Sequence, residues 1–394
     1  MFSIRVLTIM LAAGLAIGLS PAPVCAASYS VVYSFGSQDG DGSYPTAGLI
    51  NVNGVLYGTT INGGANSLGT VFKLKAGAET TLHSFGYGND GSQPYGGLIN
   101  VGGTLYGTTT YGGEYCQQIG CGTVFKITTE GHEAVLHSFS GASGSLLGPL
   151  AGLINVGGAL YGTTQAGGKY NGGTVFKIRT EGTRYEVLHS FGSGSDGANP
   201  IAGLIDVNGV LYGTTFGGGA NGSGTVFKIT KAGADYKVLH SFQGESDGAG
   251  PWAGLINAGG TLYGTTINGG TGTCCTVGLG TVFEITTEGH ETVLYRFDGS
   301  HGANPYAGLI KVGGALYGTT LKGGSYDGGT VFKLTTGGVE TVLYSFQGYP
   351  TDGTEPRADL VDVGGTLYGT TYYGGSGGCN QLIRGCGTVF KVTP

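Results

Sequence analysis

Short apolar runs separated by glycine-rich polar stretches recur along the whole chain. Four kinds of run follow one another in a fixed order and resemble AGLI, LYGTT, GTVFKI and VLHSF. Each run is rich in β-branched or aromatic residues and is bounded by glycine, so each is predicted to form a β-strand. We name these strands a, b, c and d. A helical fold is excluded because glycine, which costs about 1 kcal/mol per helix position relative to alanine, interrupts nearly every stretch of the chain.

The a-b-c-d order recurs seven times, and its spacing of about 50 residues is typical of the blades of a β-propeller. We expect the phenylalanines of strands c and d and the tyrosines of strand b to pack between adjacent blades. A glycine inside strand b, such as Gly58 or Gly107, is expected to leave room for an aromatic ring from the neighbouring blade. The strand b tyrosines are Tyr57, Tyr106, Tyr161, Tyr212, Tyr263, Tyr317 and Tyr368.

The two ends of the repeat region indicate how the ring closes. The region begins with a d-type strand, residues 31–35, and finishes with a c-type strand, residues 387–392. The seventh blade therefore lacks a d strand of its own, and the N-terminal strand can supply it. We predict an all-β fold, a single seven-bladed β-propeller of four-stranded blades over residues 27–394. Closure across the termini would leave no free sheet edge for aggregation.

The N-terminal segment, residues 1–26, differs from the repeats. Arg5 precedes an apolar run over residues 6–19, and a small-residue site follows at 24–26, which is typical of a cleaved secretory signal peptide. We expect a mature chain that is secreted, extracellular or periplasmic, with no transmembrane segment. Removing Arg5 from the 18 basic residues changes the formal net charge from −6 to −7. The basic surface of a nucleic-acid binder is therefore excluded.

The combination of LYGTT, a double glycine and GTVFKI at this spacing resembles the Gloeo/Verruco (GloVer) tandem repeat. The resemblance extends over residues 31–392. It implies an exported bacterial protein, and members of that family are often fixed to the cell surface by C-terminal anchors. This chain ends at Pro394, directly after the last strand c, so the resemblance does not extend to an anchor. It also implies no catalytic residue set.

The loops between strands b and c vary most in length, so the face that carries them and the d–a loops is predicted to be the functional face. All six cysteines of the mature chain lie in the three longest of these loops. An even cysteine count in an exported protein favours disulfides, and pairing within each loop is the simplest geometry. Metal binding is the alternative, although paired CxxC spacing and a loop histidine are missing. The expected pairs are Cys116–Cys121, Cys274–Cys275, which would be vicinal, and Cys379–Cys386.

An aspartate stands four residues before the repeat proline in five d–a loops. Because Asp-Gly is a turn signal, these aspartates can be turn residues. They can also be carboxylates around the channel mouth, available to calcium or to acid–base chemistry. The histidines of strand d are spread around the ring and are not expected to converge on a metal, so no other cofactor is predicted. The aspartates are Asp41, Asp90, Asp196, Asp247 and Asp352.

Aromatic residues gather on the predicted functional face, where they suit sugar stacking or a protein interface unless neighbouring loops bury them. Three follow the repeat proline, namely Tyr95, Trp252 and Tyr306, and three begin b–c loops, namely Phe216, Tyr372 and Tyr373.

These features favour a binding or structural module of the cell envelope, expected to be monomeric, that recognises a glycan or a surface protein. The alternative is an extracellular propeller glycosidase or polysaccharide lyase. Such an enzyme would use adjacent channel-mouth carboxylates such as Asp196 and Asp247, because glycoside hydrolysis needs two carboxyl groups about 5–10 Å apart.

Overall fold

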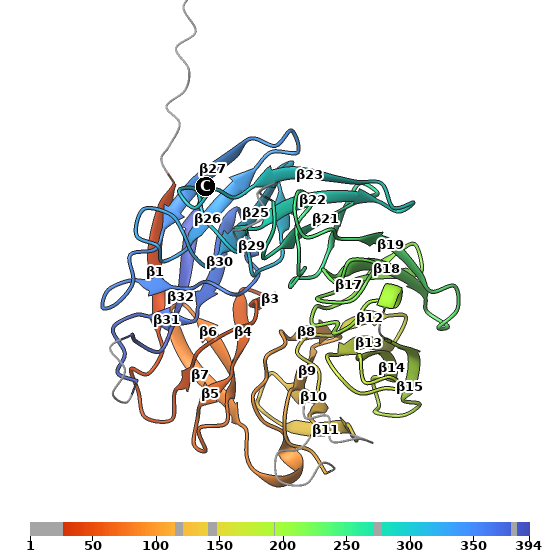
Figure 1. The fold of residues 1–394 in the computed structure, drawn as a ribbon. Helices are drawn as coiled ribbons and strands as arrows, with labels where there is room; N and C mark the ends of the chain where they lie inside the picture. Colours follow the sequence, from red (N-terminus) through yellow and green to blue (C-terminus); the bar gives the residue numbers. More distant parts are fainter. Residues whose placement is uncertain (1–26, 115–120, 141–147, 193, 271–277, 380–383) are drawn as a thin grey trace, which may run out of the picture.

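A computed structural model of the chain describes residues 27–114, 121–140, 148–192, 194–270, 278–379 and 384–394. These residues form seven four-stranded antiparallel sheets arranged around a central axis, each sheet being one blade (Figure 1). The predicted seven-bladed all-β propeller is therefore confirmed. Two short 3-10 helices, η1 (Gly88–Asp90) and η2 (Gly194–Asp196), lie in d–a loops.

The strands of blades one to three follow the predicted a-b-c-d order. Blade one contains β3 (Ile50–Val52), β4 (Val55–Thr60), β6 (Thr70–Lys75) and β7 (Ala78–Ser84). Blade two contains β8 (Ile99–Val101), β9 (Thr104–Thr109), β10 (Thr123–Thr128) and β11 (Glu133–Ser138). Blade three contains β12 (Ile154–Val156), β13 (Ala159–Thr164), β14 (Thr174–Arg179) and β15 (Glu186–Ser190).

Blades four to six repeat this order. Blade four contains β16 (Ile205–Val207), β17 (Val210–Thr215), β18 (Thr225–Thr230) and β19 (Lys237–Ser241). Blade five contains β20 (Ile256–Ala258), β21 (Thr261–Thr266), β22 (Thr281–Thr286) and β23 (Glu291–Arg296). Blade six contains β24 (Ile310–Val312), β25 (Ala315–Thr320), β26 (Thr330–Leu334) and β27 (Glu340–Ser345).

Blade seven closes the ring with strands from both ends of the chain. Its strands are β29 (Val361–Val363), β30 (Thr366–Thr371), β32 (Thr388–Thr393) and the N-terminal β1 (Ser28–Ser34). β1 pairs antiparallel with β32, with Val31 opposite Phe390 and Tyr33 opposite Val389. Figure 1 shows red β1 beside blue β32. The predicted closure across the termini is confirmed.

Two short two-stranded ladders join d–a loops to b–c loops outside the blades. They pair β2 (Gly42–Ser43) with β5 (Asn62–Gly63), and β28 (Gly353–Thr354) with β31 (Tyr373–Gly374). The two loop types expected to form the functional face are thus tied together.

Strand a is shorter than the sequence indicates, because the AGLI-like run contributes only its last residue to the strand. The preceding residues run close to the axis, where blades converge. A Cβ on Gly152 would lie 2.7 Å from the carbonyl oxygen of Gly97 in the neighbouring blade. The glycines of this run are therefore needed for the close approach of blades around the axis.

The core lies between the blades, as predicted. One interface buries Tyr57 and Phe85 of blade one against Phe125 of blade two. In each interface the phenylalanine of strand d meets that of the next blade's strand c edge to face, with ring centroids 5.1–5.3 Å apart. The seven pairs are Phe35–Phe72, Phe85–Phe125, Phe139–Phe176, Phe191–Phe227, Phe242–Phe283, Phe297–Phe332 and Phe346–Phe390.

The glycine of strand b does make room for an aromatic ring. The prediction that this ring comes from the neighbouring blade was wrong. The ring comes from strand c of the same blade. Gly107 pairs directly with Phe125, and a Cβ on Gly107 would lie 2.6 Å from Cζ of that ring. The antiparallel register places glycine and phenylalanine opposite each other, so the ring folds over the glycine and packs into the interface with the preceding blade.

We predict that Gly107→Ala destabilises the protein by about 1–3 kcal/mol, because the added methyl group overpacks the Phe125 ring. Gly337→Ala is the control, since the nearest atom to its Cβ is 3.8 Å away and its φ is not positive. This control should change the free energy of unfolding by less than about 0.5 kcal/mol. Chemical denaturation measures both values, and equal values would contradict the packing role of Gly107.

We also predict that deleting residues 27–36 lowers the free energy of unfolding by at least about 3 kcal/mol, because the deletion removes the fully buried Phe35. The deletion also exposes the edge of β32, so the variant should self-associate in light scattering. Deleting the exposed residues 393–394 is the control. A monomeric truncated protein with the wild-type melting temperature would refute the role of β1 in closure.

Candidate functional site

The residue that follows the repeat proline lines the mouth of the central channel in all seven blades. The mouth is a cavity of about 420 Å³, on the face formed by the d–a and b–c loops. Tyr111 and Gln165, which lie just after strand b in two blades, add polar groups to its lining. The seven residues after the prolines are Thr46, Tyr95, Leu150, Ile201, Trp252, Tyr306 and Arg357.

Aromatic rings and a guanidinium group form a continuous arc along one side of this mouth. The Trp252 ring lies 5.4 Å from Phe216 and 4.3 Å from Tyr306, measured between centroids. The Arg357 guanidinium lies 5.8 Å from the Tyr306 centroid and 3.8 Å from that of Tyr372. Each of these side chains is half-buried. We call these five residues the aromatic arc.

Two further tyrosines extend the arc, Tyr373 in the b–c loop of blade seven and Tyr44 in the loop that leads into blade one. The ring of Tyr44 lies 5.1 Å from Tyr372 and 5.7 Å from Tyr373. Tyr95 belongs to the cavity lining but makes no ring contact with the arc among the described residues. Of the six aromatics singled out in the sequence, five therefore lie in or beside one arc, and Tyr95 lines the same cavity.

Arg357 is held in place by an ion-pair network that the sequence analysis missed. Its guanidinium donates to Glu355 Oε2 over 2.8 Å, and Lys322 Nζ donates to Glu355 Oε1 over 2.8 Å. Although partial burial opposes it, these two cations hold the pKa of the Glu355 carboxyl below its usual range. The repeat itself carries the signal for Arg357, because this residue occupies the position that Tyr95, Trp252 and Tyr306 occupy in other blades.

Asp359 is a second departure from the repeat, deeper in the channel. Six blades have glycine at this position, the third after the proline. The carboxylate of Asp359 is open to the channel lumen but enclosed by the channel wall, and this enclosure raises its pKa. Its Oδ1 accepts a 2.5 Å hydrogen bond from the backbone of Gly308.

A hydrogen bond that recurs between the other blades is missing beside Asp359 in the described part of the chain. In six blades a strand b threonine donates to a carbonyl oxygen of the next blade near the channel, as Thr108 does to Ala151 over 2.8 Å. Thr319 is the equivalent residue in blade six, facing the blade that carries Asp359. Its buried hydroxyl has no hydrogen-bond partner in the described part of the chain.

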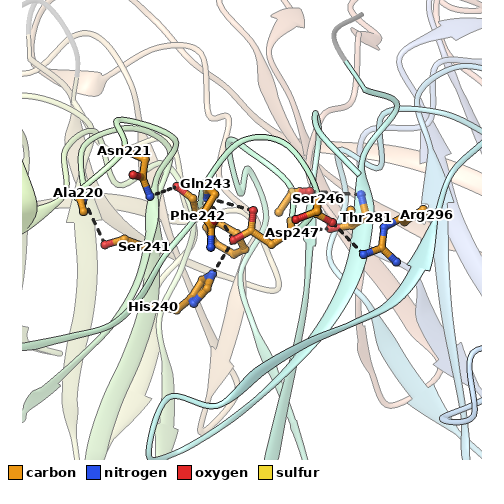
Figure 2. Close-up of polar contacts among 11 residues, drawn as sticks. Ala220, Asn221, His240, Ser241, Phe242, Gln243, Ser246, Asp247, Thr281 and Arg296 are labelled. Carbon is orange, nitrogen blue, oxygen red and sulfur yellow. Dashed lines mark hydrogen bonds and ion pairs between the residues drawn. The ribbon is translucent and has the colours of Figure 1, made fainter. Parts of the chain in front are cut away.

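The five predicted aspartates are directed into their own d–a loops. Each accepts a hydrogen bond from a backbone amide just after strand d, as Asp247 does from Gln243 over 3.0 Å (Figure 2). Each also binds the polar residue of strand d, which is histidine or tyrosine. None of the five is among the described residues that line the cavity. The geometry therefore favours the turn interpretation over the channel-mouth interpretation for these side chains.

Two of the strand d histidines meet carboxylates from two blades. His83 and His240 each lie with an aspartate and with a glutamate of the next blade, and the three ligand atoms are within 4.8 Å of one another. The glutamates are Glu133 and Glu291, and burial raises the pKa of each to about 7. The sequence analysis missed both, because each comes from a different blade than its histidine.

Three of the six cysteines of the mature chain lie in the described residues. Cys379 and Cys386 form the predicted disulfide. Cys121 is buried and disulfide-bonded, whereas Cys116, Cys274 and Cys275 lie outside the described residues. The vicinal pair therefore remains a prediction.

Solved structures similar to this one support the fold. The extracellular domain assigned to a one component system from B. thetaiotaomicron has a TM-score of 0.57 and 7% identity, over 91% of this chain and 39% of that chain. The GH74 enzyme of Niastella koreensis has a TM-score of 0.50 and 16% identity, over 78% of this chain and 46% of that chain. At these identities the likeness shows the fold alone.

The sequence comparison identifies the repeat itself. Among curated proteins the sequence has no match. A family model described as the Gloeobacter/Verrucomicrobia repeat matches two segments, residues 19–149 and 148–383, which together span most of the chain. With the LYGTT and GTVF motifs in all seven blades, this match shows that the chain belongs to the Gloeobacter/Verrucomicrobia repeat family.

Proposed function

We propose that this protein is an exported binding module that recognises a carbohydrate chain at the mouth of its channel. Membership of a propeller repeat family fits an extracellular binding or structural module. The observation that carries the finer proposal is the aromatic arc, in which Trp252 and Tyr306 remain half-exposed over a cavity of about 420 Å³.

The chemistry of the cavity suits a sugar. The apolar face of a pyranose ring stacks on an aromatic face, and its hydroxyl groups need hydrogen-bond donors and acceptors at the edge. The cavity supplies stacking surfaces in Trp252 and Tyr306, and polar groups in Tyr111, Gln165 and Arg357. A cavity with an apolar wall and a few convergent polar groups is the usual form of a small-ligand site.

The alternative function, a glycosidase or polysaccharide lyase, lacks a pair of carboxylates in the described lining of the cavity. Glycoside hydrolysis by paired carboxylates needs two such groups at the reacting bond. Among the described residues that line the cavity, Asp359 is the single carboxylate. Asp196 and Asp247, which would have formed a pair, bind their own turns instead.

Export is part of the proposal. The expected signal peptide, residues 1–26, lies outside the described residues. The Cys379–Cys386 disulfide is consistent with an oxidising, extracellular environment. The described residues include no helix with the length and hydrophobicity to cross a membrane. The disulfide supports the proposal that the mature protein lies outside the cytoplasm.

We predict that a glycan array probed with the mature protein gives binding to at least one class of glycan. Trp252→Ala should weaken that binding at least tenfold, equivalent to about 1.4 kcal/mol, because it removes the central stacking surface. Tyr87→Ala is the matched control, since Tyr87 is 83% exposed and is not part of the cavity lining. An array without a hit, or equal affinity of the Trp252→Ala variant and the wild type, would contradict the proposal.

A second prediction concerns Asp359. Asp359→Gly restores the residue found in the other six blades and removes an enclosed carboxylate. Because the pKa of Asp359 is raised in the folded protein, its ionisation opposes folding as the pH rises through that value. The substitution should therefore raise the melting temperature more at pH 8 than at pH 4, while weakening glycan binding. A pH-independent effect on the melting temperature would show that the charge is not the cause.

A further inference from the structure

We propose that this protein binds a divalent transition-metal ion at each of two equivalent sites on the outer part of the ring, beyond the proposed function at the channel mouth. One site consists of His83, Asp90 and Glu133, and the other of His240, Asp247 and Glu291. We call them the outer sites. Each spans the boundary between two blades.

The three ligands of each outer site come from corresponding positions in the repeat. In the second site, His240 lies in β19 of blade four, Asp247 lies in the following d–a loop, and Glu291 is the first residue of β23 in blade five. His240 Nε2 and Asp247 Oδ2 are 3.0 Å apart, a contact that Figure 2 shows.

The first site repeats this arrangement between blades one and two. His83 lies in β7, Asp90 in η1, and Glu133 is the first residue of β11. His83 Nε2 and Asp90 Oδ1 are 3.0 Å apart. The fold therefore builds the same constellation twice.

The glutamate supplies the observation that points to a ligand. In both outer sites its Oε1 atom is buried and has no hydrogen-bond partner within the described part of the chain. A buried acceptor without a partner costs free energy of folding. A cation within reach of the histidine nitrogen and the aspartate oxygen would supply the missing partner for Glu133 and for Glu291.

The surroundings hold the other two ligands in position. Asp90 Oδ2 accepts a hydrogen bond from the backbone of Gly86, which orients that carboxylate. The His83 ring packs edge to face on Phe85 with centroids 4.9 Å apart, and His240 packs on Phe242 at 4.8 Å. Such outer contacts fix the direction of metal ligands.

The ligand set selects the class of metal. One imidazole nitrogen and two carboxylate oxygens suit Zn²⁺, Co²⁺ or Mn²⁺, whereas Ca²⁺ prefers ligands that are all oxygen. Binding requires the lone pair of the histidine Nε2, so this nitrogen carries no proton when the metal is bound. With three protein ligands, the ion keeps at least one position for water.

The chain contains natural controls, because other blade boundaries lack one or two of the corresponding ligands. At His189–Asp196, the Tyr236 ring stacks on the histidine at 3.8 Å, in the place of the glutamate. At the boundary between blades five and six, Glu340 also has a buried Oε1 without a partner in the described residues, but Tyr295 replaces the histidine. Neither boundary offers all three ligands.

The test is isothermal titration of Zn²⁺ into the untagged mature protein after treatment with EDTA, with Co²⁺ absorption spectra as a second measurement. The wild type should bind two equivalents of Zn²⁺ at these sites. Glu133→Gln and Glu291→Gln should each remove one equivalent, and the double variant should remove both together with the Co²⁺ d–d bands. His189→Gln and Glu340→Gln, the matched controls, should bind as the wild type does.

Melting temperatures distinguish a variant that has lost metal binding from one that is misfolded. In EDTA the double variant should melt close to the wild type, and added Zn²⁺ should raise the melting temperature of the wild type but not that of the double variant. The proposal is overturned if the wild type binds no Zn²⁺, if the double variant binds as much as the wild type, or if Ca²⁺ binds these sites more tightly than Zn²⁺. It is also overturned if the control variants lose an equivalent.

Discussion

The edge-to-face contact between a strand d phenylalanine and the strand c phenylalanine of the next blade is the interaction on which the ring depends. It occurs at all seven blade boundaries, with nearly constant centroid distances. A single blade cannot bury its own apolar face, so each blade is stable only against its neighbours. The contact between blades seven and one is Phe35–Phe72, and Phe35 directly follows β1, which is why the N-terminal segment must complete blade seven.

Because the interior is the same in every blade, the structure can vary at a few fixed positions without disturbing the ring. The position after the proline holds Trp252 in one blade and Arg357 in another, and both face the same cavity. The third position after the proline is glycine except at Asp359. Substitution at equivalent positions thus breaks the sevenfold symmetry of the mouth and gives it one aromatic, charged side.

The d–a aspartates show how one residue type can serve two purposes in the same fold. Each one closes its own turn through a backbone amide, which accounts for its place in the repeat. What differs between boundaries is the neighbour contributed by the next blade, a glutamate at Asp90 and Asp247 and a tyrosine at Asp196. The same turn therefore lies beside a potential metal ligand in two places and beside an aromatic stack in another.

The sequence alone determined the fold class, the number of blades, the strand order and the closure by residues 31–35. Those features follow from local patterns, since strand period, glycine turns and repeat spacing are all properties of neighbouring residues. The packing of Phe35 and its counterparts between blades was predictable for the same reason. The origin of the ring over Gly107 was not, because it depends on the register between two strands.

Only the tertiary structure decided which candidate residues share a site. From the sequence, the d–a aspartates could be turn residues or channel-mouth carboxylates, because an Asp-Gly pair is compatible with both. The path of the loop sets the direction of each carboxylate. The sequence alone offered no reason to join His83 to Glu133, Arg357 to Tyr372, or Tyr372 to Tyr44. Such contacts arise between different blades or loops, where distance in space is fixed by ring closure and not by separation along the chain.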